Sequence, residues 1–572
     1  MRQGRLPFDL DHPYLKKQLI AYIGNKRSLQ PLLNQVFSKI GNCGRGSGRS
    51  ATQPAVFLDP FAGSGSVARL ARYLGFRVLA NDWEYYAFVL NYAHLCIGSS
   101  EAKGLFRSRG GPQALLAELN ALPPPLEADR YISRYYAPVS TEAADYHMER
   151  LFYTRENALI IDGVRSRLEK MYPGTEDTQE KLLLLAALLY QCATHTNTSG
   201  VFKACHKGFG GHSRDALGRI LSPIRLQMPI LIDAPGKAEV GCQDALQFVR
   251  SRPAELCYLD PPYNQHQYGS NYHLLNTIAL WDKPAVNNEL RGDGRLKHKA
   301  GIRKDWVKTR SAYCYRRSAG GAFRDLLEAI DARHIVLSYN TEGIIPFEEL
   351  VELLASQGRI ELFGNEYVKY RGGKQSIARQ VHNLEFVLLL DRNRSTLGPD
   401  RQRLERAVLA NRLAVLMKRS FCPEKIRRRF ALGSWKHPWL AIELEGKSYQ
   451  LPMPHLYRFS PEAAEMIGSG ADLRTLLKDL SSCECADRQE EIHVVLRILK
   501  SSSQRAERSD RDALQRRILW LLRKFAHRKY RERFEKTVAE LHTFAEEDPE
   551  GFALLLRGLS EVTVLARARF EG

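Results

Sequence analysis

Asp260 and Tyr263 stand directly after an apolar run, in the segment LCYLDPPY. Residues 256–259 are predicted to form a buried strand, and Pro261 and Pro262 end it because proline cannot continue a β-ladder. The aspartate and the tyrosine are thereby expected at the carboxyl edge of a sheet, where open α/β folds bind their ligands. These two side chains are the first candidates for chemistry.

This motif suits the activation of an exocyclic base amine, whose lone pair is conjugated into the ring and is therefore a poor nucleophile. The Asp260 carboxylate and a backbone carbonyl held in place by the prolines can accept the amine hydrogens and turn the lone pair toward an electrophile. The Tyr263 ring can stack on the base. The pattern indicates a site for methylation of a base amine, with a merely packing role for Tyr263 as the alternative.

A glycine-rich turn follows an earlier predicted strand, in the segment FLDPFAGSGS at residues 57–66. Gly63 and Gly65 allow a tight turn and a close approach of the backbone to a ligand at the start of the next helix. The following strand ends in Asn81 and Asp82, and a carboxylate there can accept hydrogen bonds from a ribose diol. The βαβ pattern predicts a nucleoside-cofactor site, and its spacing leaves nicotinamide and S-adenosylmethionine cofactors equally open.

The elements that would position these residues belong to an α/β sheet interrupted by a mainly helical region. We expect a first part of the sheet domain at 14–97, an inserted region at 98–236 and a second part of the sheet domain at 237–392. A polar stretch that contains Pro and Gly then separates the sheet domain from a basic, mainly helical C-terminal domain at 402–572.

The motifs AYIGNK, LDPFAGSGS, ND, GCQDA and LDPPY occur in this order. Together they resemble the Dam-like alpha group of adenine-N6 DNA methyltransferases, over residues 18–390. The resemblance implies a Rossmann-like sheet that binds S-adenosyl-L-methionine. It also implies site-specific methyl transfer to N6 of an adenine flipped out of double-stranded DNA, with 98–236 as the target-recognition domain.

The resemblance also assigns roles to individual residues. The catalytic motif corresponds to Asp260, Pro261, Pro262 and Tyr263. The cofactor-binding positions correspond to Tyr22, Lys26, Asp59, Phe61, Gly63, Gly65, Asp82 and Asp244. As structural alternatives, Lys26 fits a solvated charge and Asp244 fits the N-cap of a helix. Asn25 departs from the family pattern, because GNK stands where GGK is common, and we expect this loop to differ.

The charge balance favours a polyanionic partner, since 84 Lys and Arg against 64 Asp and Glu leave a formal net charge of +20. Nucleic acid is the first such partner and an anionic membrane surface the second, with a basic protein that binds neither as the plain alternative. Lys203, Lys207 and Arg214 of the inserted region are candidate DNA contacts, or else belong to a polar surface loop. The segment WVKTRSAYCYRRSAGGAF interleaves basic and aromatic residues that suit a pocket lining or a displaced strand.

Two functions remain as alternatives to DNA methylation. One is an RNA base-amine methyltransferase, because a similar motif serves RNA enzymes, and the other is a DNA-binding subunit of a defence or restriction complex. A companion endonuclease or defence-system proteins are the partners to expect. The C-terminal domain could contact DNA, present a solvated helical surface or dock a partner protein.

The cellular location, the state of the cysteines and the absence of a metal site are predicted from apolar runs and from the spacing of Cys and His. The chain shows no apolar run of about eighteen residues and no signal-peptide pattern, so we expect a cytoplasmic protein that is not inserted in a membrane. The ten cysteines are expected as reduced thiols. Cys192, His195, Cys205 and His206 cluster in sequence, but their spacing fits a zinc site poorly, and we expect no metal.

Overall fold

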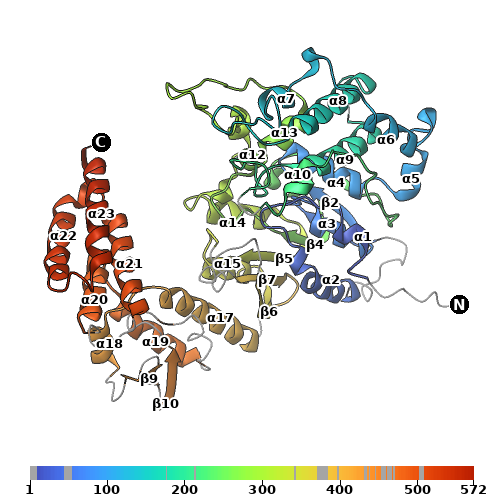
Figure 1. Cartoon of the computed structure of the whole chain (residues 1–572). Helices are drawn as coiled ribbons and strands as arrows, with labels where there is room; N and C mark the ends of the chain where they lie inside the picture. Colours follow the sequence, from blue (N-terminus) through green and yellow to red (C-terminus); the bar gives the residue numbers. More distant parts are fainter. Residues whose placement is uncertain are drawn as a thin grey trace. The chain divides into compact units, whose positions relative to one another are not determined.

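The computed structural model describes residues 9–43, 54–174, 177–211, 214–340, 343–369, 384–395, 398–430, 435–436, 439–444, 446–452, 459, 467, 470–501 and 508–571 (Figure 1). The chain forms two compact units, Met1–Leu397 and Gly398–Gly572. Among the helices of these described residues, none is both long and apolar enough to cross a membrane.

A seven-stranded sheet in the order β3-β2-β1-β4-β5-β7-β6 forms the centre of the first unit. Its strands are β1 (Val56–Asp59), β2 (Arg77–Asn81), β3 (Glu239–Gly241), β4 (Ala254–Leu259), β5 (Ala332–Asn340), β6 (Arg359–Lys369) and β7 (Leu384–Asp391). The strands from β3 to β5 are parallel, whereas β7 runs antiparallel to β5 and β6. The predicted α/β class is confirmed at the level of a mostly parallel central sheet.

The strand order places a topological switch point between β1 and β4, since the chain proceeds from β1 outward to β3 and from β4 outward in the other direction. Leu58 pairs with Leu79 of β2 and with Cys257 of β4. Parallel strands in this register end at one edge of the sheet. Ligands of open α/β sheets bind at such a point, so the fold itself marks this edge.

Helices α1 (Pro13–Lys16), α2 (Gln30–Cys43) and α3 (Ser66–Tyr73) cover part of the sheet. Phe37 of α2 and Leu70 of α3 are fully buried in one cluster with Phe57, Val78 and Leu256 of the strands. Strands that helices cover have continuous apolar sequences. This explains why the segments VFL (56–58) of β1 and LCYL (256–259) of β4 could be predicted as buried strands.

The region between β2 and β3 is helical. It contains α4 (Tyr85–Leu95), α5 (Ser99–Gly104), α6 (Pro112–Asn120), α7 (Ile132–Tyr135), α8 (Arg155–Met171), α9 (Gln179–His195) and α10 (Leu217–Leu221). The buried leucines of α9 share one hydrophobic cluster with Tyr86 of α4 and with Leu274 and Ile278 of α13 (His273–Leu280). The helices inserted after α4 therefore share a core with elements of the sheet domain and lie in the same compact unit.

The second part of the first unit carries five further helices: α11 (Ala245–Val249), α12 (Tyr268–Asn271), α13 (His273–Leu280), α14 (Ala319–Ala329) and α15 (Phe347–Ala355). Two short 3-10 helices, η5 (Lys304–Thr309) and η6 (Ala312–Cys314), lie between α13 and α14. The segment from α12 to η6 separates the end of β4 from α14, and its residues help to build the site.

The second unit has an antiparallel sheet in the order β10-β9-β8 and seven α-helices in its described residues. Its elements are α17 (Gly398–Met417), α18 (Pro423–Arg429), β8 (Trp435–Lys436), β9 (Trp439–Leu444), β10 (Lys447–Pro452), α19 (Gly470–Cys483), α20 (Arg488–Ser501), α21 (Arg508–Phe525), α22 (Arg531–Glu546) and α23 (Ala553–Glu571). One apolar cluster joins α17, α19 and β9, and another joins α20 to α23.

Candidate active site

A cavity of about 240 Å³ lies at the carboxyl edge of the sheet, next to the switch point. Six residues singled out from the sequence line it: Tyr22, Phe61, Asp82, Asp244, Asp260 and Pro262. These residues come from separate stretches of the chain. The structure thus brings the predicted cofactor motifs and the predicted catalytic motif to one cavity.

The glycine-rich turn is tied to the end of β2. Gly63 and Gly65 have φ values of +52° and +78°, and a Cβ on Gly63 would lie 2.7 Å from the Tyr22 ring. The Gly63 N–H donates to Asp82 Oδ2 over 2.9 Å, while Asp82 Oδ1 accepts from the Glu84 N–H over 2.9 Å. Burial raises the pKa of Asp82 to about 6. Both carboxylate oxygens therefore help to hold the turn in shape.

Aromatic rings form two walls of the cavity. The Tyr22 ring is stacked with Tyr268 and Tyr272 at centroid distances of 5.3 and 5.0 Å. The Phe61 ring meets Tyr313 edge to face at 5.3 Å. Apolar rings facing a cavity with a few fixed polar groups are typical of sites for flat heteroaromatic ligands.

Asp244 and Asp59 each have a structural role that can be read directly. Asp244 Oδ1 accepts hydrogen bonds from the backbone N–H groups of Leu246 and Gln247 and caps α11, and the residue also lines the cavity. Asp59 is buried, and its Oδ1 accepts from the Phe61 N–H over 3.3 Å. Its Oδ2 has no hydrogen-bond partner in the described part of the chain. Burial and the nearby Asp260 raise its pKa well above the ordinary value.

The catalytic candidate Asp260 forms an ion pair with Lys26 at 2.9 Å. Lys26 is only 2% exposed, and its Nζ also lies 3.5 Å from Glu385 and donates to the Gly24 carbonyl over 2.9 Å. Burial alone lowers the pKa of Lys26, but the negative charges of Asp260 and Glu385 outweigh it and hold the pKa well above its ordinary value. Lys26 thus contacts the catalytic motif and does not line the cavity.

Burial dominates the titration of Asp260 and raises its pKa to about 6. The positive charge of Lys26 and a hydrogen bond from Ser338 oppose this shift, and the negative charge of Glu385 adds to it. A pKa near 6 leaves the group as a carboxylate at neutral pH. The ionised Asp260 carboxylate can therefore accept hydrogen bonds from a base amine at neutral pH.

Tyr263 is held from several sides. Its ring meets Tyr339 edge to face at 5.7 Å, its hydroxyl donates to Glu385 Oε1 over 3.4 Å, and its carbonyl accepts from the Ile344 N–H. Lys26 Nζ lies 4.9 Å from the ring centroid. These contacts fix the ring beside Asp260.

Sequence reasoning missed three residues of this site: Glu385, Ser338 and Glu84. Glu385 stands at the beginning of β7 and is buried, although the apolar run EFVLLL hides it. Glu84 lines the cavity and accepts a hydrogen bond from Asn276, and burial together with Asp82 raises its pKa to about 7. An acidic residue at the start of an otherwise apolar strand is the signal that could have revealed Glu385.

The basic and aromatic segment predicted as a pocket lining does contribute to the cavity, through residues 309–313. Asn25, the departure from the family pattern, accepts the Arg27 N–H and donates to Ser64 of the glycine-rich turn. The loop before Lys26 is therefore linked to that turn by a side chain that glycine would lack.

The candidate DNA contacts Lys203, Lys207 and Arg214 are exposed and lie outside the cavity lining. Hydrogen bonds join their segment to the predicted catalytic part. The Phe202 N–H donates to the Asn271 carbonyl, and the Phe202 carbonyl is hydrogen-bonded to His273 Nε2. In the cysteine and histidine cluster, Cys205 Sγ accepts from the Leu151 N–H. Within the described ranges, no group of three or more His, Cys, Asp or Glu side chains is arranged to hold a metal ion.

A mostly parallel sheet, a glycine turn joined to an acidic strand end, and a half-buried aspartate followed by Pro-Pro-Tyr are the arrangement expected of enzymes that modify a base amine. The model of the D12 class N6 adenine-specific DNA methyltransferase family matches residues 22–349. The chain belongs to this family. The predicted family and the predicted enzyme class, an adenine-specific DNA methyltransferase, are thereby confirmed.

Curated relatives align with about two thirds of the chain. The type II methyltransferase M.NlaIII of Neisseria lactamica is 31% identical over 370 residues, which are 64% of this chain and 97% of the relative. The modification methylase LlaI of Lactococcus lactis subsp. lactis is 29% identical over 66% of this chain and 57% of its own length. M.FokI of Planomicrobium okeanokoites is 29% identical over 59% of this chain and 48% of its own length.

Proposed function

We propose that this enzyme transfers a methyl group from S-adenosyl-L-methionine to N6 of an adenine flipped out of double-stranded DNA at a specific sequence. One observation carries the proposal: Asp260, the acceptor suited to a base amine, lines the same cavity as Asp82 and the residues beside the glycine turn. An adenine held by the catalytic motif would therefore meet a cofactor held by the turn.

The cavity fits the nucleoside part of this cofactor. Tyr22 and Phe61 offer aromatic walls, and Gly63 and Gly65 let the turn pack tightly against Tyr22 and Asn91, where a Cβ would collide. We assign the ribose hydroxyls to Asp82 and the adenine amine to Asp244, with Asp59 supporting the turn from the end of β1. When bound, S-adenosylmethionine would supply an electrophilic methyl group on a sulfonium, with the thioether as the leaving group.

The protein's part in the reaction is to prepare the amine. The Asp260 carboxylate and the Pro261 carbonyl each accept a hydrogen bond from the N6 amine. The nitrogen lone pair then leaves conjugation with the ring and points toward the cofactor. Tyr263 stacks on the base, and Pro262 limits the motion of the motif. After transfer, Asp260 accepts the excess proton of the methylated amine and passes it to solvent. Positioning of this kind accounts for a large share of the rate.

Lys26 is assigned a supporting role in catalysis rather than a direct contact with the cofactor. Its ion pair with Asp260 opposes the effect of burial and keeps that carboxyl charged at neutral pH. Glu385 holds both Lys26 and the Tyr263 hydroxyl. The two residues together set the charge and the position of the catalytic motif.

Base extraction requires contacts with duplex DNA outside the cavity. We assign target recognition to the inserted region 98–236, with Lys203, Lys207 and Arg214 as contacts to phosphates or bases. The cofactor-binding part is 14–97 and the catalytic part 237–392, while 402–572 is a separate basic domain. Because the relatives are named type II methyltransferases or modification methylases, we propose a role in restriction and modification, in the cytoplasm, beside a companion endonuclease.

The proposal is tested by transfer of a labelled methyl group to duplex DNA by the wild type and by Asp260→Asn. We expect the variant to lose at least about a thousandfold in rate while its affinity for S-adenosylmethionine stays within about threefold. Asp325→Asn serves as the matched control, because Asp325 also lines the cavity but has no assigned role. Undiminished transfer by Asp260→Asn would refute the assignment.

A further inference from the structure

A short basic hairpin at residues 287–299 follows the catalytic motif and α13 along the chain. We call it the ribbon. Leu290 and Leu296 form an antiparallel bridge. The Arg291 N–H donates to the Arg295 carbonyl over 2.7 Å, and the Gly294 N–H donates to the Arg291 carbonyl over 2.9 Å. Gly294 has a φ of +76°, which allows the tight turn. The ribbon is therefore an ordered two-stranded element with Arg291 and Arg295 at its tip.

A buried arginine of the inserted region anchors both legs of this ribbon. Arg150 is 3% exposed, and it donates to Asn288 Oδ1 and to the Asn287 carbonyl at 2.7 Å, and to the His298 carbonyl at 2.8 Å. The Leu296 N–H donates to the His147 carbonyl over 2.8 Å. Fixing an exposed loop costs conformational entropy. The anchoring thus presents the tip in a defined position.

The outer side of the ribbon is basic. Arg291, Arg295, Lys297 and Lys299 are exposed. Two acids of the ribbon offset part of this charge, since Lys297 pairs with Glu289 at 3.2 Å and Arg295 lies 3.9 Å from Asp293. These pairs are more than half exposed, and salt screens such pairs. The ribbon retains a positive excess.

One further cation, Lys207, lies beside the ribbon. Lys299 and Lys207 each place Nζ 5.7 Å from the centroid of the Tyr146 ring, although they lie far apart in the sequence. Lys207 is one of the DNA contacts predicted from the sequence. The ribbon is therefore next to the segment that was already expected to meet DNA.

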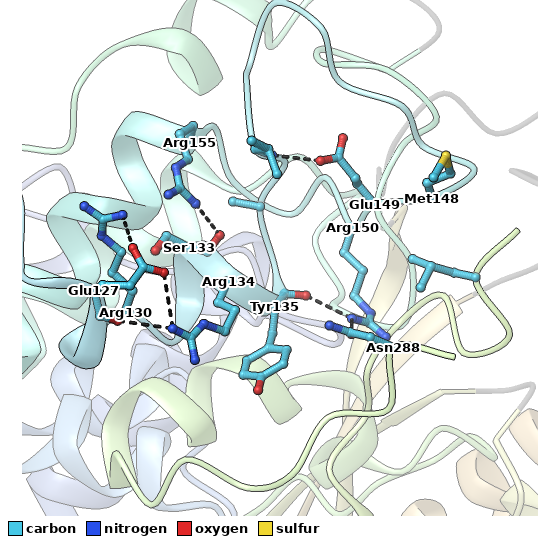
Figure 2. Close-up of a pocket in the computed structure, with 13 residues that line it drawn as sticks. Glu127, Arg130, Ser133, Arg134, Tyr135, Met148, Glu149, Arg150, Arg155 and Asn288 are labelled. Carbon is cyan, nitrogen blue, oxygen red and sulfur yellow. Dashed lines mark hydrogen bonds and ion pairs between the residues drawn. The ribbon is translucent and has the colours of Figure 1, made fainter. Parts of the chain in front are cut away.

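An arginine-lined pocket of about 400 Å³ lies between the ribbon and residues 127–155. Figure 2 shows Arg150 reaching Asn288 of the ribbon, and Arg130, Arg134 and Arg155 on the opposite side. Arg130 and Arg134 share one carboxylate, that of Glu127, which is 71% exposed, while Arg155 donates to the Ser133 carbonyl. Four guanidinium groups line the pocket against two carboxylates, Glu127 and Glu149, and Glu149 already accepts hydrogen bonds from the Val139 and Asp145 N–H groups. This excess of guanidinium groups suits a phosphate better than a neutral or cationic ligand.

We infer that the ribbon, together with Lys207 and the arginine-lined pocket, binds the sugar-phosphate backbone of the DNA duplex. The inference rests on the proposed function for the identity of the polyanion. It extends the DNA-binding surface beyond the inserted region to a segment that follows the catalytic motif. A phosphate surface of this kind adds affinity and register, while bases are read elsewhere.

The test is the salt dependence of duplex binding by the full chain. For Arg291→Ala/Arg295→Ala, the slope of log K against log salt concentration should fall by about one to two, because each lost phosphate contact removes about 0.9. The dissociation constant at low salt should rise at least about tenfold, and the affinity for S-adenosylmethionine should not change. Lys17→Ala/Lys237→Ala, which removes equal charge from two exposed lysines outside the inserted region and the ribbon, should leave the slope near that of the wild type.

Two results would overturn the inference: a slope for the ribbon variant equal to that of the wild type, or an equal fall in the control. Methyl transfer by the wild type, measured in the same samples, keeps the proposed function separate. If the wild type binds DNA but does not methylate it, the proposed function fails while the comparison of slopes still decides the role of the ribbon.

Discussion

At the scale of single residues, the catalytic carboxyl Asp260 is under two opposing influences. Burial and Glu385 raise its pKa, whereas Lys26 and Ser338 lower it, and the balance lies at about 6. The carboxylate is the form that can accept the amine hydrogen. Methyl transfer should therefore fall as the pH drops through about 6, because protonation converts the acceptor into a donor.

Methyl transfer plotted against pH should have an acidic limb, the range near pH 6 over which the rate falls. Variants of two residues that neighbour Asp260 should move this limb in opposite directions. Lys26→Gln removes the cation that lowers the pKa of Asp260, so the limb should shift to higher pH. Glu385→Gln removes an anion that raises the pKa, so the limb should shift to lower pH. The measurement is single-turnover methyl transfer with saturating substrates between about pH 5 and pH 8.

A merely structural role for these residues predicts something else. Loss of packing would lower the rate at every pH and leave the position of the limb unchanged. Parallel profiles for both variants would therefore contradict the electrostatic assignment.

The glycine turn allows a second test at this scale. Gly63→Ala combines a positive φ with a Cβ placed 2.7 Å from the Tyr22 ring, so it should weaken cofactor binding about tenfold or more. Gly75→Ala is the matched control, since Gly75 has a φ of +90° but its nearest neighbour would be 3.8 Å away. Isothermal titration with S-adenosylmethionine compares them. Equal affinity of the two variants would argue against a cofactor role for the turn.

Residues of the site were predictable where a motif adjoins a strand end. Asp260 follows an apolar run directly, and Asp82 follows one with only Asn81 between, so their place at one sheet edge could be inferred from the amino-acid sequence alone. Ser338 and Glu385 could not be inferred, because strand pairing brings them to Asp260 from distant segments: Ser338 through the pairing of β4 with β5, and Glu385 through that of β5 with β7. Lys26 was predicted as a motif residue, but its ion pair depends on the same tertiary arrangement.

At the scale of elements, the inserted helices and the ribbon are joined by Arg150. Arg150→Met should lower the free energy of unfolding by about 2–4 kcal/mol, since it leaves the carbonyls of Asn287 and His298 without this buried donor. Amide hydrogen exchange should accelerate selectively at residues 287–299.

Arg155→Met provides the comparison, because the Arg155 guanidinium donates to the Ser133 carbonyl, which lies outside the ribbon. It should leave exchange in the ribbon unchanged. A uniform increase in exchange throughout the first unit after Arg150→Met would contradict the anchoring role.

The ribbon shows which element-scale signals were available and which were not. The sequence ELRGDGRLK contains Asp-Gly between two basic residues, a recognised hairpin signal. Its attachment to Arg150 had no signature in the sequence, because the anchoring bonds go largely to backbone carbonyls, which no residue pattern displays. The βαβ unit at β1 and β2 was predictable because local periodicity alone defines it.

At the scale of the whole molecule, the first unit contains the complete cavity and the family match at 22–349. The alignment with M.NlaIII covers 97% of that methyltransferase with 64% of this chain. We therefore expect a protein of residues 1–397 to methylate the same DNA sequence as the full chain. Methylation assays on a common substrate test this, and a folded but inactive 1–397 protein would show that residues 398–572 are required.

Asp260 is assigned to the methylation of adenine N6 in DNA. The most direct measurement is modification-sensitive sequencing of DNA from a methylation-free host that expresses either the wild type or Asp260→Ala. We predict N6-methyladenine at one recurring sequence with the wild type and its absence with the variant. Methylation that persists in the variant, or no methylated adenine with an expressed and folded wild type, would contradict the account.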